Sequence, residues 1–290
     1  MLNKNIETFI ACDADYPDAA AVLYGAPYDG TTSFRPGTRF GPHAVRAESY
    51  GLETYSPYQD ADLTDYSVFD SGDLELPYGS VERALAMIEE RAQTILADGK
   101  LPFLIGGEHL VTLGAVRAVA RRYPELAIVH FDAHADLRDE YLGDALSHAA
   151  VIRRCHDIVG DGRIFQFGIR SGDRSEFQWS AAGHTVMRKF DFEGLAETLD
   201  SLAGRPVYFT VDLDVLDPSV FPGTGTPEAG GVTFDALRRA AETVCRTCRV
   251  VGCDVCELSP GYDASGVSTA VAGKIIREML LALFSRTVSF

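Results

Sequence analysis

Short apolar segments rich in β-branched and aromatic residues alternate along the chain with longer segments of helical periodicity. This alternation constrains the fold most, because strands that alternate with helices build parallel sheets through right-handed βαβ crossovers. Continuous apolar runs such as AIVHF at 127–131 predict strands that are covered on both faces. We expect eight strands, at Ala21–Gly25, Ser67–Ser71, Leu101–Ile105, Ala127–Asp132, Arg163–Gly168, Thr185–Arg188, Val207–Asp212 and Val250–Glu257.

The remaining segments carry helix signals, such as a serine cap at Ser80 and a proline early in the helix that begins at Pro42. Seven helices are expected, at Pro42–Leu52, Ser80–Ala97, Leu110–Arg122, Ser147–His156, Phe192–Leu202, Phe234–Cys245 and Ala270–Leu283. No linker rich in proline, glycine or serine divides the chain. The sequence therefore predicts a single three-layer α/β/α domain over residues 1–290 with a mainly parallel sheet.

Charge and hydropathy narrow the class of partner. Of 290 residues, 26 are Lys or Arg and 42 are Asp or Glu, which gives a formal net charge of −16. A surface this negative repels phosphate backbones and anionic lipids, so we expect no nucleic acid or membrane partner and favour cationic ligands or metal ions. The N-terminal segment lacks the apolar core of a secretory signal, and no apolar run approaches the roughly 18 to 20 residues that span a bilayer. We therefore expect a cytoplasmic protein whose six cysteines stay reduced.

The strand AIVHF leads directly into the segment DAHAD, which places Asp132, His134 and Asp136 at alternate positions. If this segment stays extended, its period of two residues directs all three side chains to one face. Three metal-type ligands would then converge beyond the end of the strand, where open α/β sheets build their sites.

Two further strands end in residues of the same chemistry. The strand at 207–212 continues into DLD, with Asp212 and Asp214 two positions apart, and the strand at 101–105 leads to GGEHL, with His109 after a glycine pair. Four converging carboxylates would repel one another unless cations neutralise them. Carboxylate and imidazole ligands without a thiolate suit Mn²⁺ best, with Fe²⁺, Co²⁺ and Zn²⁺ as competitors. Six ligands exceed the need of one catalytic ion, so two ions that share carboxylates are expected.

Each motif alone also has a purely structural interpretation. DAHAD could be a solvated turn, His109 a packed or capping residue, and DLD a helix cap. We interpret the cysteine pairs CRTC (245–248) and CDVC (253–256) as buried thiols, because the gap between them is short for a zinc site and Cys253 and Cys256 should face opposite sides of a strand. The loop PGTGTPEAGG (222–231) lacks the lysine of a phosphate-binding loop and is interpreted as a wall of the active site.

Through GGEHL, FDAHADLR, FTVDLDVLDPS and CDVCELSPGYD, the sequence resembles the ureohydrolases, the family of arginases and agmatinases. The resemblance includes YGAPYDGTTSFRPGTRFGP near the start and STAVAGKIIREML near the end, so it covers nearly the whole chain. Bacterial agmatinases are the most similar members. The resemblance implies an arginase-like α/β/α domain around a parallel sheet of about eight strands.

The resemblance further implies two manganese ions per subunit, bridged by Asp132 and Asp212. The other ligands divide between the ions as His109 with Asp136 and His134 with Asp214. Hydroxide held between the ions would attack the guanidinium carbon of the substrate. Glu257 corresponds to the carboxylate that binds the guanidinium group, and His148 to a histidine that transfers protons. A charged strand end and a surface histidine are the alternative interpretations of these two residues.

The implied reaction converts agmatine and water to putrescine and urea. The loop LRDEYLGDALSH (137–148) does not reproduce the arginase pattern that binds a substrate carboxylate, a group that agmatine lacks. Ala135 stands where the family often has threonine, and Asp173 falls near an amine-binding carboxylate of arginases without being assigned that role. The alternatives are a guanidinobutyrase, an arginase, a non-catalytic metal-binding relative and a single-zinc deacetylase. The family also implies a homo-oligomer, a trimer or a hexamer.

Overall fold

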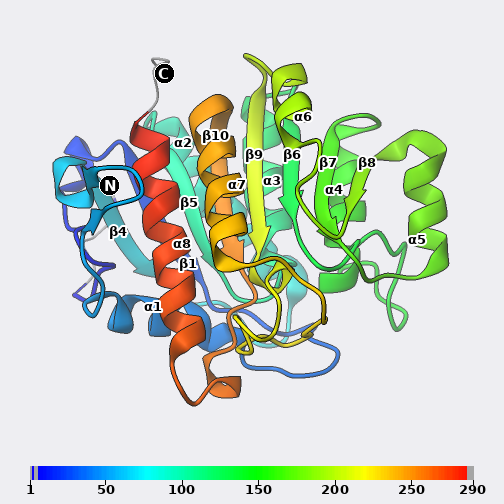
Figure 1. The fold of residues 1–290 in the computed structure, drawn as a ribbon, viewed down its shortest axis with the longest axis horizontal. Coiled ribbons are helices and arrows are strands. Elements are labelled where there is room, and N and C mark those ends of the chain that lie inside the picture. Colours follow the sequence, from blue (N-terminus) through cyan, green and yellow to red (C-terminus); the bar gives the residue numbers. More distant parts are fainter. Residues whose placement is uncertain (1, 3–5, 286–290) are drawn as a thin grey trace.

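Eight strands form one parallel sheet in the computed structural model, which describes residue 2 and residues 6–285 (Figure 1). The order along the sheet is β4, β1, β5, β10, β9, β6, β7 and β8, and all seven pairings are parallel. The strands are β1 (Ala21–Ala26), β4 (Val68–Asp73), β5 (Leu101–Gly106), β6 (Ala127–Phe131), β7 (Ile164–Ile169), β8 (Val186–Lys189), β9 (Pro206–Asp212) and β10 (Arg249–Cys256). The predicted fold class is confirmed, and every expected strand is present with its ends shifted by at most two residues.

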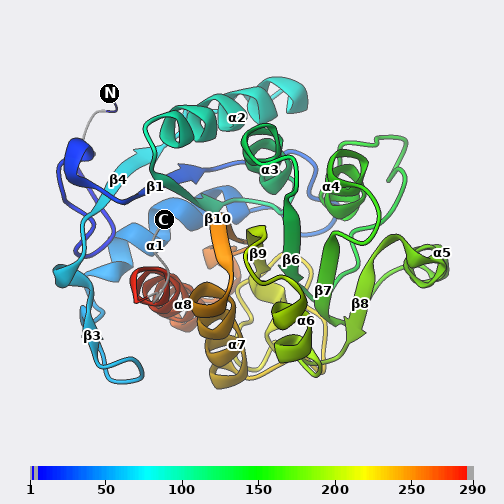
Figure 2. The ribbon, with the colours of Figure 1, turned by 90° about the horizontal axis from the view of Figure 1, so that it is seen from above.

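Helices cover both faces of this sheet (Figure 2). One face carries α2 (Val81–Ala97), α3 (Val111–Arg122) and α4 (Val151–Val159). The other face carries α1 (Gly41–Ser49), α6 (Leu195–Ser201), α7 (Phe234–Thr247) and α8 (Val267–Phe284). The expected helices are present, although a 3₁₀ turn at His148–Ala150 precedes α4. Among the described residues, no helix combines the length and the apolar character that crossing a membrane requires.

Two elements differ from the sequence-based expectation. A hairpin of β2 (Tyr55–Ser56) and β3 (Ala61–Asp62) has strands of two residues, too short to show a period. The helix α5 (Arg174–Trp179) has six residues and lies beside the edge strand β8, where the Lys189 ammonium sits over the Phe177 ring at 4.9 Å. Its start is capped by Glu176, whose Oε2 accepts the backbone N–H of Asp173 at 2.6 Å.

Side chains of the central strands alternate between two apolar cores. In β9, Val207, Phe209 and Val211 pack into the core that contains α7 and α8, whereas Tyr208 packs into the core that contains α2 and α3. Both faces of the strand are therefore buried, which explains why its sequence is continuously apolar.

The strand order places the functional loops together. The chain passes from β5 through α3 to β6, and β10 and β9 lie between these two strands in the sheet. Because parallel strands present their carboxyl ends at one edge, the segments that follow β5, β6, β9 and β10 meet there. Such a crossover is where open α/β sheets bind their ligands.

Candidate active site

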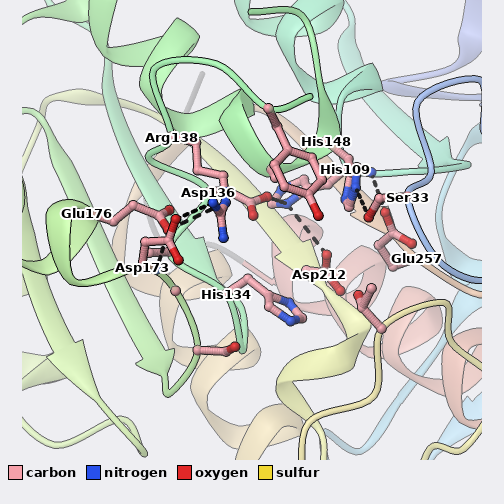
Figure 3. Close-up of a pocket in the computed structure, with 16 residues that line it drawn as sticks. Ser33, His109, His134, Asp136, Arg138, His148, Asp173, Glu176, Asp212 and Glu257 are labelled. Carbon is pink, nitrogen blue, oxygen red and sulfur yellow. Dashed lines mark hydrogen bonds and ion pairs between the residues drawn. The ribbon is translucent and has the colours of Figure 1, made fainter. Parts of the chain in front are cut away.

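A cavity of about 280 Å³ opens at this edge of the sheet (Figure 3). Six of the eight predicted site residues line it, namely His109, His134, Asp136, His148, Asp212 and Glu257. The other two, Asp132 and Asp214, are fully buried and contact the histidines of the cavity. The structure therefore brings all the predicted site residues to one place.

His109 lies among three carboxylates at one end of this cluster. Its Nδ1 is 3.1 Å from Asp132 Oδ2, 3.1 Å from Asp136 Oδ2 and 3.5 Å from Asp212 Oδ2. These four side chains come from the ends of β5, β6 and β9. They form one group of potential metal ligands.

His134 forms the second group with Asp214. Its Nδ1 is 3.0 Å from Asp214 Oδ2 and 3.5 Å from Asp132 Oδ1. Asp132 therefore directs one oxygen toward each histidine, Oδ2 toward His109 and Oδ1 toward His134. A carboxylate in this position is suited to bridge two ions.

These separations fit the coordination of metal ions. Two ligand atoms that each lie about 2.1 Å from one ion, at right angles, are about 3.0 Å apart. The histidine and aspartate atoms of both groups lie near that separation before any ion is placed. Four carboxylates and two imidazoles are also the donor set that suits Mn²⁺.

Thr210 determines which nitrogen of His109 faces the carboxylates. The Thr210 hydroxyl donates its one proton to Asp254 Oδ1 at 2.6 Å, so its oxygen accepts the Nε2 proton of His109 at 2.9 Å. When a cation displaces the proton on Nδ1, the neutral ring keeps its Nε2 proton and presents the Nδ1 lone pair toward Asp132 and Asp136. This hydrogen-bond chain prepares His109 to bind a cation through Nδ1.

The pKa shifts in the cluster reflect crowded negative charge. Burial, followed by the charge of Asp214, raises the pKa of Asp212 well above its ordinary value. Burial and the charge of Asp132 raise the pKa of Asp136 to about 7. Burial opposes a charge on His109, but hydrogen bonds with Asp132 and Asp136 outweigh it and hold its pKa well above the ordinary value. Such a site favours any cation that can enter it.

Two site residues leave the extended conformation that the sequence predicts. Asp136 has φ 51° and Glu257 has φ 67°, both in the left-handed region. The DAHAD segment already bends at Ala133, directly after its first ligand, and β10 ends one residue before Glu257. The side chains of both residues nevertheless line the cavity.

Glu257 is fixed beside the metal-ligand cluster by backbone contacts. Its N–H donates to the Gly107 carbonyl at 2.9 Å, and its Oε1 accepts the N–H of His109 at 2.7 Å. The predicted glycine pair permits a second close contact, because a side chain at Gly107 would collide with the backbone of Tyr28. Burial, then the charges of Asp214 and Glu108, raise the pKa of Glu257 well above its ordinary value.

His148 faces the cavity from the turn that precedes α4. Its Nε2 lies 3.1 Å from Ser33 Oγ, and the edge of the Tyr141 ring lies beside it, with ring centroids 6.2 Å apart. Burial, followed by the charges of His134 and His109, lowers the pKa of His148 to about 4. The imidazole is therefore neutral at pH 7.

Glu108 positions the loop that holds His148, and sequence reasoning missed it. The buried carboxylate accepts hydrogen bonds from the Thr31 hydroxyl at 2.7 Å and the Thr32 hydroxyl at 3.0 Å, and also from the Thr31 backbone N–H. The Thr31 oxygen accepts the N–H of His148 at 3.0 Å. The available signal was a charged residue directly before His109 at the end of an apolar strand.

The cavity wall opposite Glu257 contains a group of paired charges. Arg138 forms ion pairs with Asp173 and with Glu176, the latter at 3.8 Å. Asp173 is thus paired with an arginine. The loop 222–231 contributes Thr226, which lines the cavity and donates to Asp214 Oδ2 at 3.3 Å, so the interpretation of this loop as a wall is confirmed.

The cysteines and Ala135 lie in the apolar interior. All six cysteines are buried, and Cys253 and Cys256 pack into opposite cores, as predicted. In the described part of the chain, no group of cysteines has metal-ligand spacing. Ala135 is fully buried and packs with the core of α2 and α3.

The fold and this cluster of histidines and carboxylates define a metal-dependent α/β enzyme scaffold. The chain matches the model of the Arginase family over residues 19–282 and belongs to that family. An agmatinase from Bacillus subtilis is 49% identical over 95% of this chain and 96% of its own length. A crystal structure of a provisional agmatinase from Clostridium difficile is 49% identical with a TM-score of 0.91, over 93% of this chain and 98% of that one. A guanidinobutyrase from Pseudomonas aeruginosa is 36% identical over 93% of this chain and 88% of its own.

Proposed function

We propose that this protein is a manganese-dependent hydrolase with two metal ions, and that it converts agmatine and water to putrescine and urea. The observation that carries the proposal is a single cavity lined by four metal-type ligands and by the buried carboxylate of Glu257, with two further ligands, Asp132 and Asp214, in contact with its histidines. The 49% identity to the agmatinase of Bacillus subtilis supports this choice of reaction.

The six side chains that would hold the ions are His109, Asp132, His134, Asp136, Asp212 and Asp214. When bound, divalent ions lower the pKa of water so that hydroxide is available near neutral pH. We propose Mn²⁺ because four carboxylate ligands favour a hard cation and two imidazoles accept a softer one.

Glu257 would hold the guanidinium group of the substrate. Its carboxylate can accept N–H bonds from the planar guanidinium, which stays protonated throughout the physiological pH range. Burial disfavours a charge on Glu257 in the absence of a partner, and a cationic substrate would restore the ionised form. The N–H of His109 would keep this carboxylate at a fixed distance from the metal ligands.

His148 would transfer the proton that the leaving amine needs. When the bond between the guanidinium carbon and the substituted nitrogen breaks, that nitrogen leaves as an amine and must gain a proton. A neutral imidazole beside Ser33 can take a proton from the attacking water and deliver it to this nitrogen. Urea and putrescine are then the two products.

Arg138 bears on which group the substrate carries at the end away from the guanidinium, a carboxylate or an amine. It is the sole arginine or lysine among the described residues that line the cavity, and Asp173 and Glu176 already pair with it. A substrate carboxylate would have to displace these acids, whereas the amine of agmatine enters an acidic pocket without such a cost. The observation that favours 4-guanidinobutyrate as a second candidate is the position of Arg138 on the cavity wall. If Arg138 released Asp173 and Glu176, it could bind the carboxylate of that substrate.

The test is urea release from Mn²⁺-loaded protein with agmatine, arginine and 4-guanidinobutyrate side by side, together with a chelated sample. We expect release from agmatine that the chelator abolishes and added Mn²⁺ restores. Preference for 4-guanidinobutyrate would keep the reaction and replace the substrate. Absence of urea from all three would overturn the proposal. We also propose that the protein is cytoplasmic and that it forms a homo-oligomer, a trimer or a hexamer. A mass measurement in solution tests the oligomeric state.

A further inference from the structure

A second cluster of metal-type ligands lies outside the catalytic cavity, near the edge of the sheet where α4 and α5 flank β7 and β8. Nε2 of His156 and Nδ1 of His184 each lie 2.7 Å from the same oxygen, Oδ1 of Asp161. The three potential ligand atoms are within 4.8 Å of one another. None of these residues lines the catalytic cavity.

The backbone brings these residues together from two separate segments. His156 lies in the last turn of α4, which ends at Val159 and is followed by Gly160. Gly160 and Gly162 both have positive φ, 83° and 68°, and the tight turn between them returns Asp161 to His156. The N–H of Gly162 donates to the carbonyl of His184 at 3.3 Å, so this turn is attached to the segment that follows α5.

Aromatic packing fixes the two imidazole rings. Trp179 stacks on His184 with ring centroids 4.4 Å apart and an interplanar angle of 16°. The same indole meets the edge of His156 at 4.6 Å, and the guanidinium of Arg153 lies 4.2 Å from its centroid. The rings are therefore held in place before any ligand binds.

The cluster is open to solvent on the side of the carboxylate. The side chain of Asp161 is 66% exposed, against 14% for His156 and 35% for His184. An ion can thus reach the ligand atoms directly from solvent, and the open side leaves room for coordinated water.

We propose that His156, Asp161 and His184 form an exchangeable Zn²⁺ site that is distinct from the catalytic centre. Two imidazoles and one carboxylate with an open position for water are a recurrent zinc ligand set. With one carboxylate where the catalytic cluster has four, this site favours Zn²⁺ over Mn²⁺. The ion would tie the turn after α4 to the segment after α5.

The geometry requires a small adjustment on binding. Ligand atoms about 2.0 Å from a tetrahedral zinc ion are about 3.3 Å apart, so Asp161 must withdraw by about half an ångström. Its position on an exposed turn permits that movement. When the ion is bound, each neutral imidazole carries its single proton on the nitrogen that faces away from Asp161, so the other nitrogen offers its lone pair to the ion.

The chain contains a built-in probe, because Trp179 is its single tryptophan. In Mn²⁺-loaded full-length protein, Co²⁺ titration should quench the Trp179 emission with one saturable step, and Zn²⁺ should reverse the quenching. Asp161→Asn keeps the stacked rings but removes the anionic ligand, and it should weaken Co²⁺ binding by about tenfold or more. Dialysis against Zn²⁺ should leave about one ion fewer per chain in this variant than in the parent.

His43→Gln is the matched control, because His43 is an exposed histidine that pairs with Glu7 at 3.4 Å, outside the cluster. It should bind Co²⁺ as the parent does. Equal quenching in the parent and Asp161→Asn, or no quenching in the parent, would show that the cluster is an ion pair between side chains and would overturn the proposal. The readouts are fluorescence and zinc content, so this result is independent of whether agmatine is the substrate.

Discussion

The backbone N–H of His109 donates a hydrogen bond to Oε1 of Glu257 at 2.7 Å, across the neighbouring strands β5 and β10. The bond joins a metal ligand to the carboxylate proposed to bind the guanidinium group. Because a backbone group makes it, the distance between these two parts of the site is set by the sheet itself. A neutral side chain of the same length at position 257 can therefore accept the same backbone N–H and stay in the same position.

Glu257→Gln tests the role of that charge. The amide oxygen of Gln can still accept the N–H of His109, so the metal-ligand cluster should keep its geometry and its two ions. Charge-assisted hydrogen bonds to the guanidinium would be lost, at about 1.5 to 3 kcal/mol each, and kcat/KM for agmatine should fall by about 100-fold or more. Urea assays and metal counting on the same sample measure both quantities. Unchanged kcat/KM would remove Glu257 from substrate binding.

Much of this architecture could be predicted from the sequence, because strand periodicity and ligand type are local properties. The segments around Asp132 and Asp212 combine an apolar strand with acids two residues apart, and both features are readable without a fold. Glu108 and Asp254 are different, since each acts through partners more than 40 positions away, at Thr31 and Tyr208. Only the packing of the sheet shows which hydroxyl each carboxylate meets.

The backbone conformation at two site residues could not be predicted from the sequence either. Glutamate rarely adopts the left-handed conformation found at Glu257, and aspartate adopts it more often but less readily than glycine, so residue type alone predicts neither position. In both cases the surrounding hydrogen bonds determine the backbone, including the bond from the N–H of Glu257 to the Gly107 carbonyl. The short helix α5 was missed because six residues show too little periodicity.

Thr210→Val tests the hydrogen-bond chain behind His109. Valine has nearly the shape of threonine but cannot accept the Nε2 proton of His109 or donate to Asp254. The orientation of the imidazole and its tautomer are then no longer fixed, and affinity for Mn²⁺ should fall by about 10 to 100-fold. Loss of a donor to buried Asp254 should also lower the free energy of unfolding by about 1 to 3 kcal/mol.

Thr210→Ser is the matched control, because it keeps the hydroxyl and removes only a methyl group. It should bind Mn²⁺ with nearly the affinity of the parent, as measured by titration of the metal-free protein. Equal weakening in the Ser and Val variants would mean that packing at position 210, rather than the hydrogen bond, supports the metal ligand.

Glu108→Gln tests the positioning of the His148 loop. The amide cannot accept all the hydrogen bonds from Thr31 and Thr32, and its NH₂ group faces donors. Because Thr31 accepts the N–H of His148, we expect kcat to fall by about tenfold while the number of bound metal ions stays unchanged. Steady-state kinetics with agmatine and metal analysis would separate these effects. A loss of metal without a change in the loop would place Glu108 with the ligands instead.

Asp132 and Asp214 should differ in how many ions they hold. The two oxygens of Asp132 face His109 and His134, whereas Asp214 contacts His134 and leaves the group around His109 untouched. Asp132→Asn should therefore weaken both metal positions and abolish urea release, while Asp214→Asn should keep about one ion per chain. Metal analysis after dialysis against limiting Mn²⁺ measures the difference, with Asp200→Asn, at an exposed position in α6, as control. Equal metal content in the Asp132 and Asp214 variants would contradict the bridging position of Asp132.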